Sequence, residues 1–153
     1  MIKKSSIPFI VDSRNFPCDY DLAIRKMNEF ELMSLFKPSL KPHDELSDTE
    51  IKSAGLKLFE KFKQLIVVTR GHKSTYIIDD NKVTEISSVK VSGVIDTVGA
   101  GDSFLAGFSC VYGVIKNAIL AVEIGQKMAA ITIKKIGETG VATPVEILQN
   151  HQE

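Results

Sequence analysis

Residues 95–107 read IDTVGAGDSFLAG and place small residues between two carboxylates at the start of an apolar stretch. The three residues from Gly99 to Gly101 lie between Asp96 and Asp102. Residues without bulky side chains let consecutive backbone N–H groups converge on an anion at a helix N-terminus. The stretch therefore predicts an anion-binding turn. The simpler alternative is a tight turn in which Asp102 is the N-terminal helix cap.

Two well-known phosphate-binding loops do not fit this stretch. A P-loop requires lysine after its last glycine, but the chain has Gly101-Asp102-Ser103. A dinucleotide-binding fingerprint requires a third glycine where Phe104 stands. A carboxylate beside an anion site repels phosphate unless it accepts a proton, which is the task of a general base in phosphoryl transfer. The residues therefore favour Asp102 as a general base.

Residues 96–108 follow the pattern Asp-Thr-x-Gly-Ala-Gly-Asp-x-x-x-Ala-Gly-Phe, which resembles the C-terminal signature of the ribokinase-like (PfkB) carbohydrate kinases. This resemblance implies an α/β fold, a three-layer α/β/α sandwich with a mostly parallel sheet. It also implies transfer of the γ-phosphoryl group of ATP to a hydroxyl of a sugar or sugar phosphate, with Mg²⁺ as cofactor. By the same resemblance, Asp102 is the catalytic base, and the amides of Gly99, Ala100 and Gly101 form the anion hole.

Two further elements of the chain resemble metal-binding features of the family. Asn28-Glu29-Phe30-Glu31 is similar to its Asn-x-x-Glu element, which implies that Asn28 and Glu31 help to place magnesium, usually through water. A solvated helix start is the alternative interpretation. Asp96 and the backbone around Val98 resemble a monovalent-cation site, for an ion such as K⁺, that only some members use.

The nucleotide is expected to contact a turn and a helix. Thr69-Arg70-Gly71 is similar to the family's Thr-x-Gly turn, which contacts the nucleotide phosphates and ribose, although Ser74 stands where a further glycine is usual. A plain hairpin connection is the alternative. Small residues on the predicted helix 117–135 leave room for the base, although they are also typical of helix packing. The remaining candidate nucleotide-binding residues are Thr97, Asn117, Ala121 and Gly125.

Hydrophobic periodicity predicts strands that alternate with helices in a single domain spanning residues 1–153. Ser47 and Glu50 form a capping box ahead of a helix that extends to Phe62. The predicted strands are 7–11, 65–69, 75–78, 83–86 and 89–91, and the other predicted helices are 20–36, one from Asp102 to Ile115, and 117–135.

Composition narrows the class of protein further. Nineteen basic and nineteen acidic side chains give a formal net charge of zero, which argues against nucleic-acid binding. Two distant cysteines, Cys18 and Cys110, and the absence of an apolar run long enough to cross a membrane favour a cytoplasmic protein.

The length of the chain departs from the family, whose members are about twice as long. The resemblance covers their C-terminal half, whereas the N-terminal half normally supplies sugar-binding residues and a β-sheet lid. We therefore expect a portion of a kinase, or a chain that works beside another chain or as a homo-oligomer. A nucleotide-binding or interaction module without turnover is the alternative. Residues 11–14 and 140–146 look more like the heptose-phosphate kinase branch than like ribokinase or fructokinase.

Overall fold

The computed structural model describes residues 7–15, 17–41, 44–138 and 140–149. The chain divides into two compact units, residues 1–87 and residues 88–153. No change in composition marks this division in the sequence, because both units mix apolar and charged residues.

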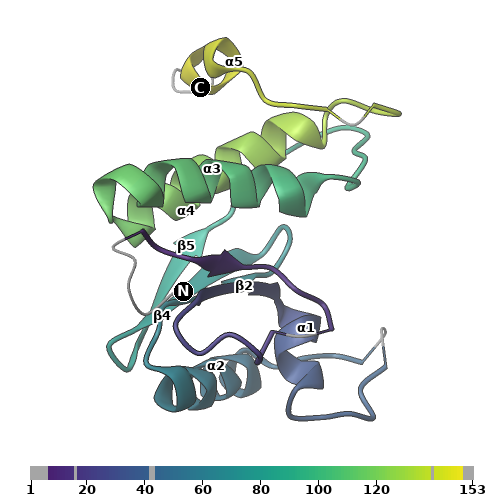
Figure 1. Ribbon diagram of the computed structural model, residues 1–153. Coiled ribbons are helices and arrows are strands. Elements are labelled where there is room, and N and C mark those ends of the chain that lie inside the picture. The colour runs from purple at the N-terminus through teal and green to yellow at the C-terminus, as the bar shows by residue number, and fades with distance from the viewer. Residues whose placement is uncertain (1–6, 16, 42–43, 139, 150–153) are drawn as a thin grey trace. The chain divides into compact units, whose positions relative to one another are not determined.

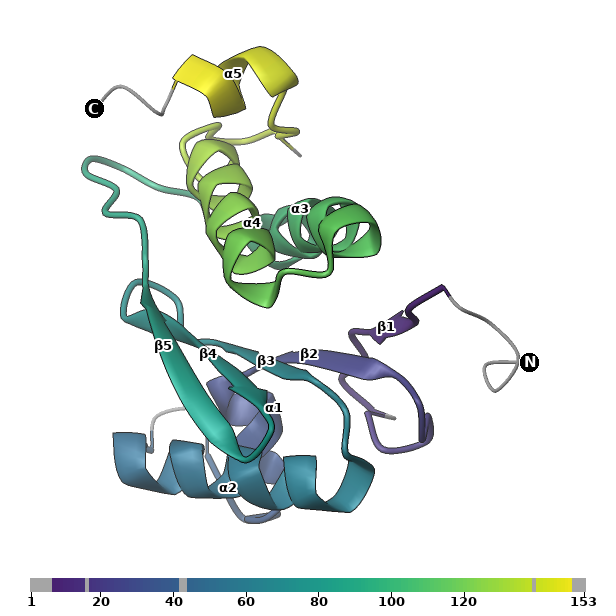
Figure 2. The same cartoon turned by 90° about the vertical axis from the view of Figure 1, so that its left-hand side faces the viewer.

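The first unit is a five-stranded sheet with two helices packed on one of its faces (Figures 1 and 2). The strands lie in chain order across the sheet. They are β1 (Ile10–Val11), β2 (Ile24–Asn28), β3 (Ile66–Thr69), β4 (Ser74–Asp79) and β5 (Lys82–Ser87), and the helices are α1 (Glu29–Ser34) and α2 (Asp48–Phe62).

Four of the five strands run in the same direction. Strands β1, β2 and β3 pair in parallel, and β4 pairs antiparallel with both β3 and β5. Parallel strands end at the same edge of a sheet, so the residues that follow β1, β2 and β3 gather at one edge. This edge carries Asp12, the Asn28–Glu31 element and the Thr69–Gly71 turn.

The core of the first unit lies between the sheet and the two helices. Helix α2 begins at the predicted capping box, in which the Glu50 amide donates to Ser47 Oγ and the Glu50 carboxylate accepts from the Ser47 amide. Its apolar face then packs on the sheet. The buried residues of this core are Met27, Leu32, Met33, Ile51, Ala54, Leu58, Phe59, Ile66, Val68, Tyr76 and Ile78.

Residues 20–36 form strand β2 followed by the short helix α1, so the prediction of one helix there is wrong. The strand is buried although it contains Arg25 and Lys26, because both charges have partners inside the fold. Arg25 donates to the carbonyls of Pro17 and Ala23, each at 2.9 Å, and to that of Tyr20. Burial lowers the pKa of Arg25 below its ordinary value. Lys26 Nζ lies 2.7 Å from Asp12 Oδ2.

Two predicted strands also differ from the structure. The first covers only Ile10–Val11, because Pro8 lacks the N–H that a longer ladder requires. Residues 89–91 form no strand, since no strand in the described part of the chain pairs with them. The hairpin of β4 and β5 matches the predicted strands 75–78 and 83–86 closely.

The second unit is built on a hairpin of two helices, α3 (Ala100–Ile115) and α4 (Ala118–Thr132), followed by the short helix α5 (Pro144–Gln149) (Figure 2). Glycines let α3 and α4 approach closely. A Cβ added at Gly125 would lie 2.8 Å from the carbonyl oxygen of Phe104, and one at Gly107 would lie 3.1 Å from the Cα of Gly125. No helix in the described part of either unit is long and apolar enough to span a membrane.

Strand β1 leads to a prediction about association. It lies at the edge of the described sheet, beside a side chain, Ile7, that is 71% exposed. Because an open strand edge next to apolar surface favours pairing with another chain, we expect the 153-residue chain, produced by itself, to self-associate. Ile7→Lys should reduce this association, as edge lysines do. Sedimentation velocity measures it, and a parent that stays monomeric over a wide concentration range would contradict the prediction.

Candidate active site

The turn before α3 contains a glycine in the left-handed conformation. Gly99 is the N-cap of α3 and adopts a left-handed conformation with φ 78°, which favours glycine. The Ala100 amide donates to the Thr97 carbonyl at 3.2 Å, and the Ser103 amide donates to the Gly99 carbonyl at 2.9 Å. The amides of Gly101 and Asp102 lie in the first turn and have no acceptor within the helix. An anion held here by the predicted amides would therefore compete with Thr97 for the amide of Ala100.

Asp102 is the third residue of α3, and its side chain is exposed. Its carboxylate does not cap the helix, because the N-cap is Gly99 and no side chain makes a cap hydrogen bond there. The cap interpretation of Asp102 is therefore wrong. The neighbouring Ser103 Oγ accepts a 2.8 Å hydrogen bond from Thr132 Oγ1, which joins the first turn of α3 to the end of α4.

Asp96 organises the loop that leads into this turn. Its amide donates to the Ile133 carbonyl at 2.8 Å. Its carboxylate oxygens accept from the amides of Val98, at 3.0 Å, and Gly137, at 3.4 Å. Asp96 therefore links residues 96–98 to the segment after α4, and its use in a monovalent-cation site stays a prediction.

In the first unit, Asn28 and Glu31 form a capping box at the start of α1. The Glu31 amide donates to Asn28 Oδ1 at 2.8 Å, and the Asn28 amide donates to Glu31 Oε2 at 2.7 Å. Glu31 Oε1 lies 3.8 Å from Nε of Arg14, an exposed side chain. The helix start that was the alternative for this element is thus present, and its cap uses Oε2 of the Glu31 carboxylate.

The donors at this helix start suit magnesium. No group of three or more His, Cys, Asp or Glu side chains in the described residues is placed to enclose a metal ion. Magnesium is usually held by one or two carboxylates together with substrate phosphates and water, so a single carboxylate such as Glu31 fits an ion that arrives with a nucleotide.

The Thr69–Gly71 segment comprises the last residue of β3 and the start of its connection to β4. Thr69 Oγ1 donates to the Met27 carbonyl at 3.4 Å, and the Lys73 amide donates to the Arg70 carbonyl at 3.1 Å. Gly71 has φ 57°, and a Cβ added to it would meet no atom within 4 Å. The turn therefore exposes backbone at the edge of the sheet where Asn28 and Glu31 also lie.

Arg70, within this turn, was not among the predicted site residues. Its side chain is 2% exposed and lies among a serine, a tyrosine and three acids, which are Glu29, Asp48 and Glu85. Burial acts to lower the pKa of Arg70, but the hydrogen bond to Glu29 and the charges of Tyr76 and Asp48 outweigh it and raise that pKa above its ordinary value. The partners of Arg70 lie up to 41 residues away from it in the sequence, so no local pattern indicates the cluster.

The candidates on α4 all have structural roles. Asn117 is the N-cap of α4, and its Oδ1 accepts from the Leu120 amide at 3.1 Å. Ala121 and Gly125 are buried, and Gly125 packs against Phe104 of α3. Their part in binding the nucleotide base stays a prediction.

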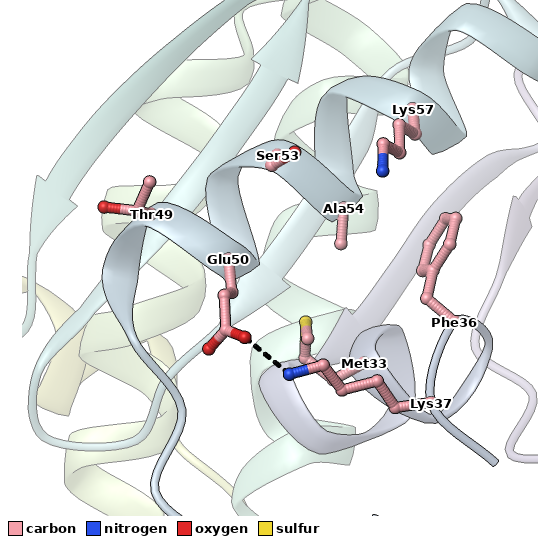
Figure 3. Close-up of a pocket in the computed structure, with 8 residues that line it drawn as sticks. All are labelled: Met33, Phe36, Lys37, Thr49, Glu50, Ser53, Ala54 and Lys57. Atoms are coloured by element: carbon pink, nitrogen blue, oxygen red, sulfur yellow. Dashed lines mark hydrogen bonds and ion pairs between the residues drawn. The ribbon is translucent and has the colours of Figure 1, made fainter.

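A separate pocket lies between α1 and α2 (Figure 3). It has a volume of about 410 Å³, and an ion pair between Lys37 and Glu50 crosses it. None of the predicted site residues lines it. The hollow is therefore a feature of the helix pair, distinct from the sheet edge that carries Asn28, Glu31 and Thr69.

Comparison with known proteins identifies the family. Residues 21–145 match the model of the pfkB family carbohydrate kinases, so the chain belongs to that family. It is 30% identical over 130 residues to an adenosine kinase of Schizosaccharomyces pombe, covering 80% of this chain and 36% of that protein. It is 28% identical over 126 residues to the bifunctional protein HldE of a Marinomonas species, covering 76% of this chain and 26% of that protein.

Solved structures confirm the fold class. A ribokinase from Thermotoga maritima matches with a TM-score of 0.77 at 22% identity, covering 99% of this chain and 51% of that one. A ribokinase from Cryptococcus neoformans in complex with ADP matches with a TM-score of 0.73 at 25% identity, covering 90% and 47%. The chain has the ribokinase-like α/β fold and spans about half or less of the proteins that it matches.

Proposed function

We propose that this chain is the nucleotide-binding and catalytic portion of a kinase that transfers the γ-phosphoryl group of ATP to a hydroxyl of a sugar, sugar phosphate or nucleoside. The observation that carries the proposal is the exposed carboxylate of Asp102 in the first turn of α3, directly after the left-handed Gly99. Membership of the family and the ADP complex of a similar ribokinase support the choice of nucleotide.

In this proposal Asp102 accepts the proton of the acceptor hydroxyl as the oxygen attacks the γ-phosphorus, and ADP leaves. Backbone amides of the first turn, from Gly99 to Gly101, stabilise the charge on the transferring group. When bound, Mg²⁺ would neutralise negative charge on the β- and γ-phosphates. Glu31, with Asn28, would orient that ion, and Thr69 and Gly71 would contact the nucleotide.

The acceptor class is broader than the sequence alone indicated. The similar proteins include an adenosine kinase as well as ribokinases and HldE, so a nucleoside joins the sugars and heptose phosphates as a candidate. ADP release measured with a panel of ribose, fructose, fructose 1-phosphate, heptose 7-phosphate and adenosine tests the proposal. Release that depends on one of these acceptors supports a kinase. Nucleotide binding without acceptor-dependent release from any of them, in a protein that also carries the remaining portion of the fold, would favour a binding module.

A substitution at Glu31 tests its assignment to magnesium. Glu31→Gln keeps the helix cap, because glutamine also serves at this position of a capping box. We expect it to raise the Mg²⁺ concentration needed for half-maximal turnover, and to leave metal-free ADP affinity nearly unchanged, because it removes only the charge. Glu45→Gln, at an exposed glutamate before α2, is the matched control. A magnesium titration of Glu31→Gln that overlays the parent's would count against the assignment.

A further inference from the structure

The guanidinium of Arg70 is anchored on several sides within the first unit. Nη1 donates to Ser74 Oγ at 3.1 Å and to the hydroxyl of Tyr76, whose ring lies 4.5 Å from the guanidinium carbon. Nη2 pairs with Asp48 at the start of α2. These contacts fix the guanidinium to β4 and α2.

The third nitrogen of the guanidinium, Nε, reaches α1. Arg70 Nε donates to Glu29 Oε2 at 3.1 Å, and the Glu29 side chain is only 13% exposed. A second cation of the same turn, Lys73, has its Nζ 3.9 Å from Glu29 Oε1. Glu29 is the first residue of α1, so the ion pair attaches the start of that helix to the connection between β3 and β4.

The positions of the two residues in the chain give this ion pair its significance. Arg70 lies between Thr69 and Gly71, and Glu29 lies between Asn28 and Glu31. Helix α1 has only six residues, so its own hydrogen bonds hold its first turn weakly. The contact with Arg70 therefore limits where the Glu31 carboxylate can lie.

Lysine cannot replace arginine in this arrangement. Its single ammonium is a point charge on a flexible stem, whereas the planar guanidinium bonds several acceptors in fixed directions at once. Asp48, Ser74 and Tyr76 hold the guanidinium in place, so it presents Nε to Glu29 in a defined direction. Because the guanidinium is already held in a defined orientation, its ion pair with Glu29 also fixes the position of that carboxylate.

We propose that Arg70 is a positioning residue, which binds Glu29 to hold the start of α1, and with it the Glu31 carboxylate, at a fixed place beside the Thr69–Gly71 turn. The role of Glu31 in binding magnesium rests on the proposed function. The attachment of α1 by the ion pair of Arg70 and Glu29 does not depend on that function.

The first test measures how strongly Mg²⁺ enhances ADP binding to the full chain, by calorimetry with and without the metal. We expect Glu29→Gln and Arg70→Gln each to reduce this enhancement roughly tenfold, the scale typical of lost outer-shell partners. Metal-free ADP affinity should stay near the parent's in Glu29→Gln. The double variant should lose no more than either single one, because both remove the same contact.

Asp48→Asn is the matched control, because it neutralises another carboxylate on the same guanidinium, at α2 instead of α1. It should reduce the enhancement by Mg²⁺ much less than Glu29→Gln or Arg70→Gln, because Ser74 and Tyr76 still hold the guanidinium and its bond to Glu29 is kept. Arg70→Gln leaves the Glu29 carboxylate in the protein. If this variant also shows a smaller enhancement of ADP binding by Mg²⁺, the loss comes from positioning and not from removal of a metal ligand at Glu29. An equal reduction in all three single variants, or none in Glu29→Gln and Arg70→Gln, would overturn the proposal.

A second readout needs no nucleotide. The Glu31 amide, which donates to Asn28 Oδ1, should exchange its hydrogen at least several-fold faster in Glu29→Gln and Arg70→Gln than in the parent or in Asp48→Asn. Unchanged exchange would overturn the proposal whatever the nucleotide does. Faster exchange in a protein that shows no Mg²⁺-enhanced ADP binding would sustain the positioning of α1 and count against the proposed function instead.

Discussion

Asp102→Asn is expected to lower turnover by about 10²–10⁴-fold, the contribution typical of a general base, in a protein that carries this chain with the remaining portion of the fold. Asparagine keeps the shape of the side chain but cannot accept the hydroxyl proton. ADP affinity should stay near the parent's or increase, because a negative charge beside the phosphates is removed. Acceptor-dependent ADP release and calorimetric ADP binding measure the two effects.

The stability of this variant separates a catalytic role from a structural one. Gly99, not Asp102, is the N-cap, so the substitution removes only a favourable charge from the first turn of α3, worth about 0.3–1 kcal/mol. Glu123→Gln, at an exposed acid on α4, is the matched control and should keep full turnover. An Asp102→Asn enzyme as active as the Glu123→Gln enzyme would end the general-base assignment.

Gly125→Ala is expected to lower the free energy of unfolding by about 1–3 kcal/mol, the usual cost of overpacking. Its new Cβ would lie 2.8 Å from the Phe104 carbonyl oxygen, a main-chain atom that moves only if α3 moves with it. Urea denaturation measures the change as a lower midpoint with an unchanged slope.

Gly113→Ala, on α3, provides the opposite case. Gly113 is exposed within the helix, and an added Cβ would meet no atom within 4 Å. Alanine there should raise the free energy of unfolding by about 0.5–1 kcal/mol, because it restricts the unfolded chain and favours helix. If the two substitutions had the same sign of effect, close packing of α3 on α4 would not be the reason for glycine at position 125.

Local patterns predicted much of the fold. The Ser47–Glu50 capping box, the hairpin of β4 and β5, and helices α3 and α4 all depend on residues near one another in the sequence. Strand β2 was missed because its buried face includes Arg25, whose partners are main-chain carbonyls that no side-chain pattern reveals. No local pattern indicates the division into two compact units, because contacts across the whole chain define it.

The candidate site was predictable where a motif is contiguous. Residues 96–108 indicated the turn and helix that the structure contains, although the helix begins two residues before Asp102. The Arg70 cluster joins Arg70 to residues up to 41 positions away, and two of its acids, Glu29 and Asp48, are each typical of a solvated helix start when taken alone. Only the folded sheet edge brings them together.

The contacts of Arg25 bear on how much the loop before β2 can vary. The guanidinium binds the carbonyls of Pro17, Tyr20 and Ala23, and its face lies 3.4 Å from the ring centre of Phe62. Every residue type offers the same carbonyl oxygen, so the side chains of this loop can change while its path is kept. We therefore expect substitutions at an exposed loop position such as Asp19 to be tolerated, and substitution of Arg25, which binds the carbonyls of the loop, to destabilise the fold.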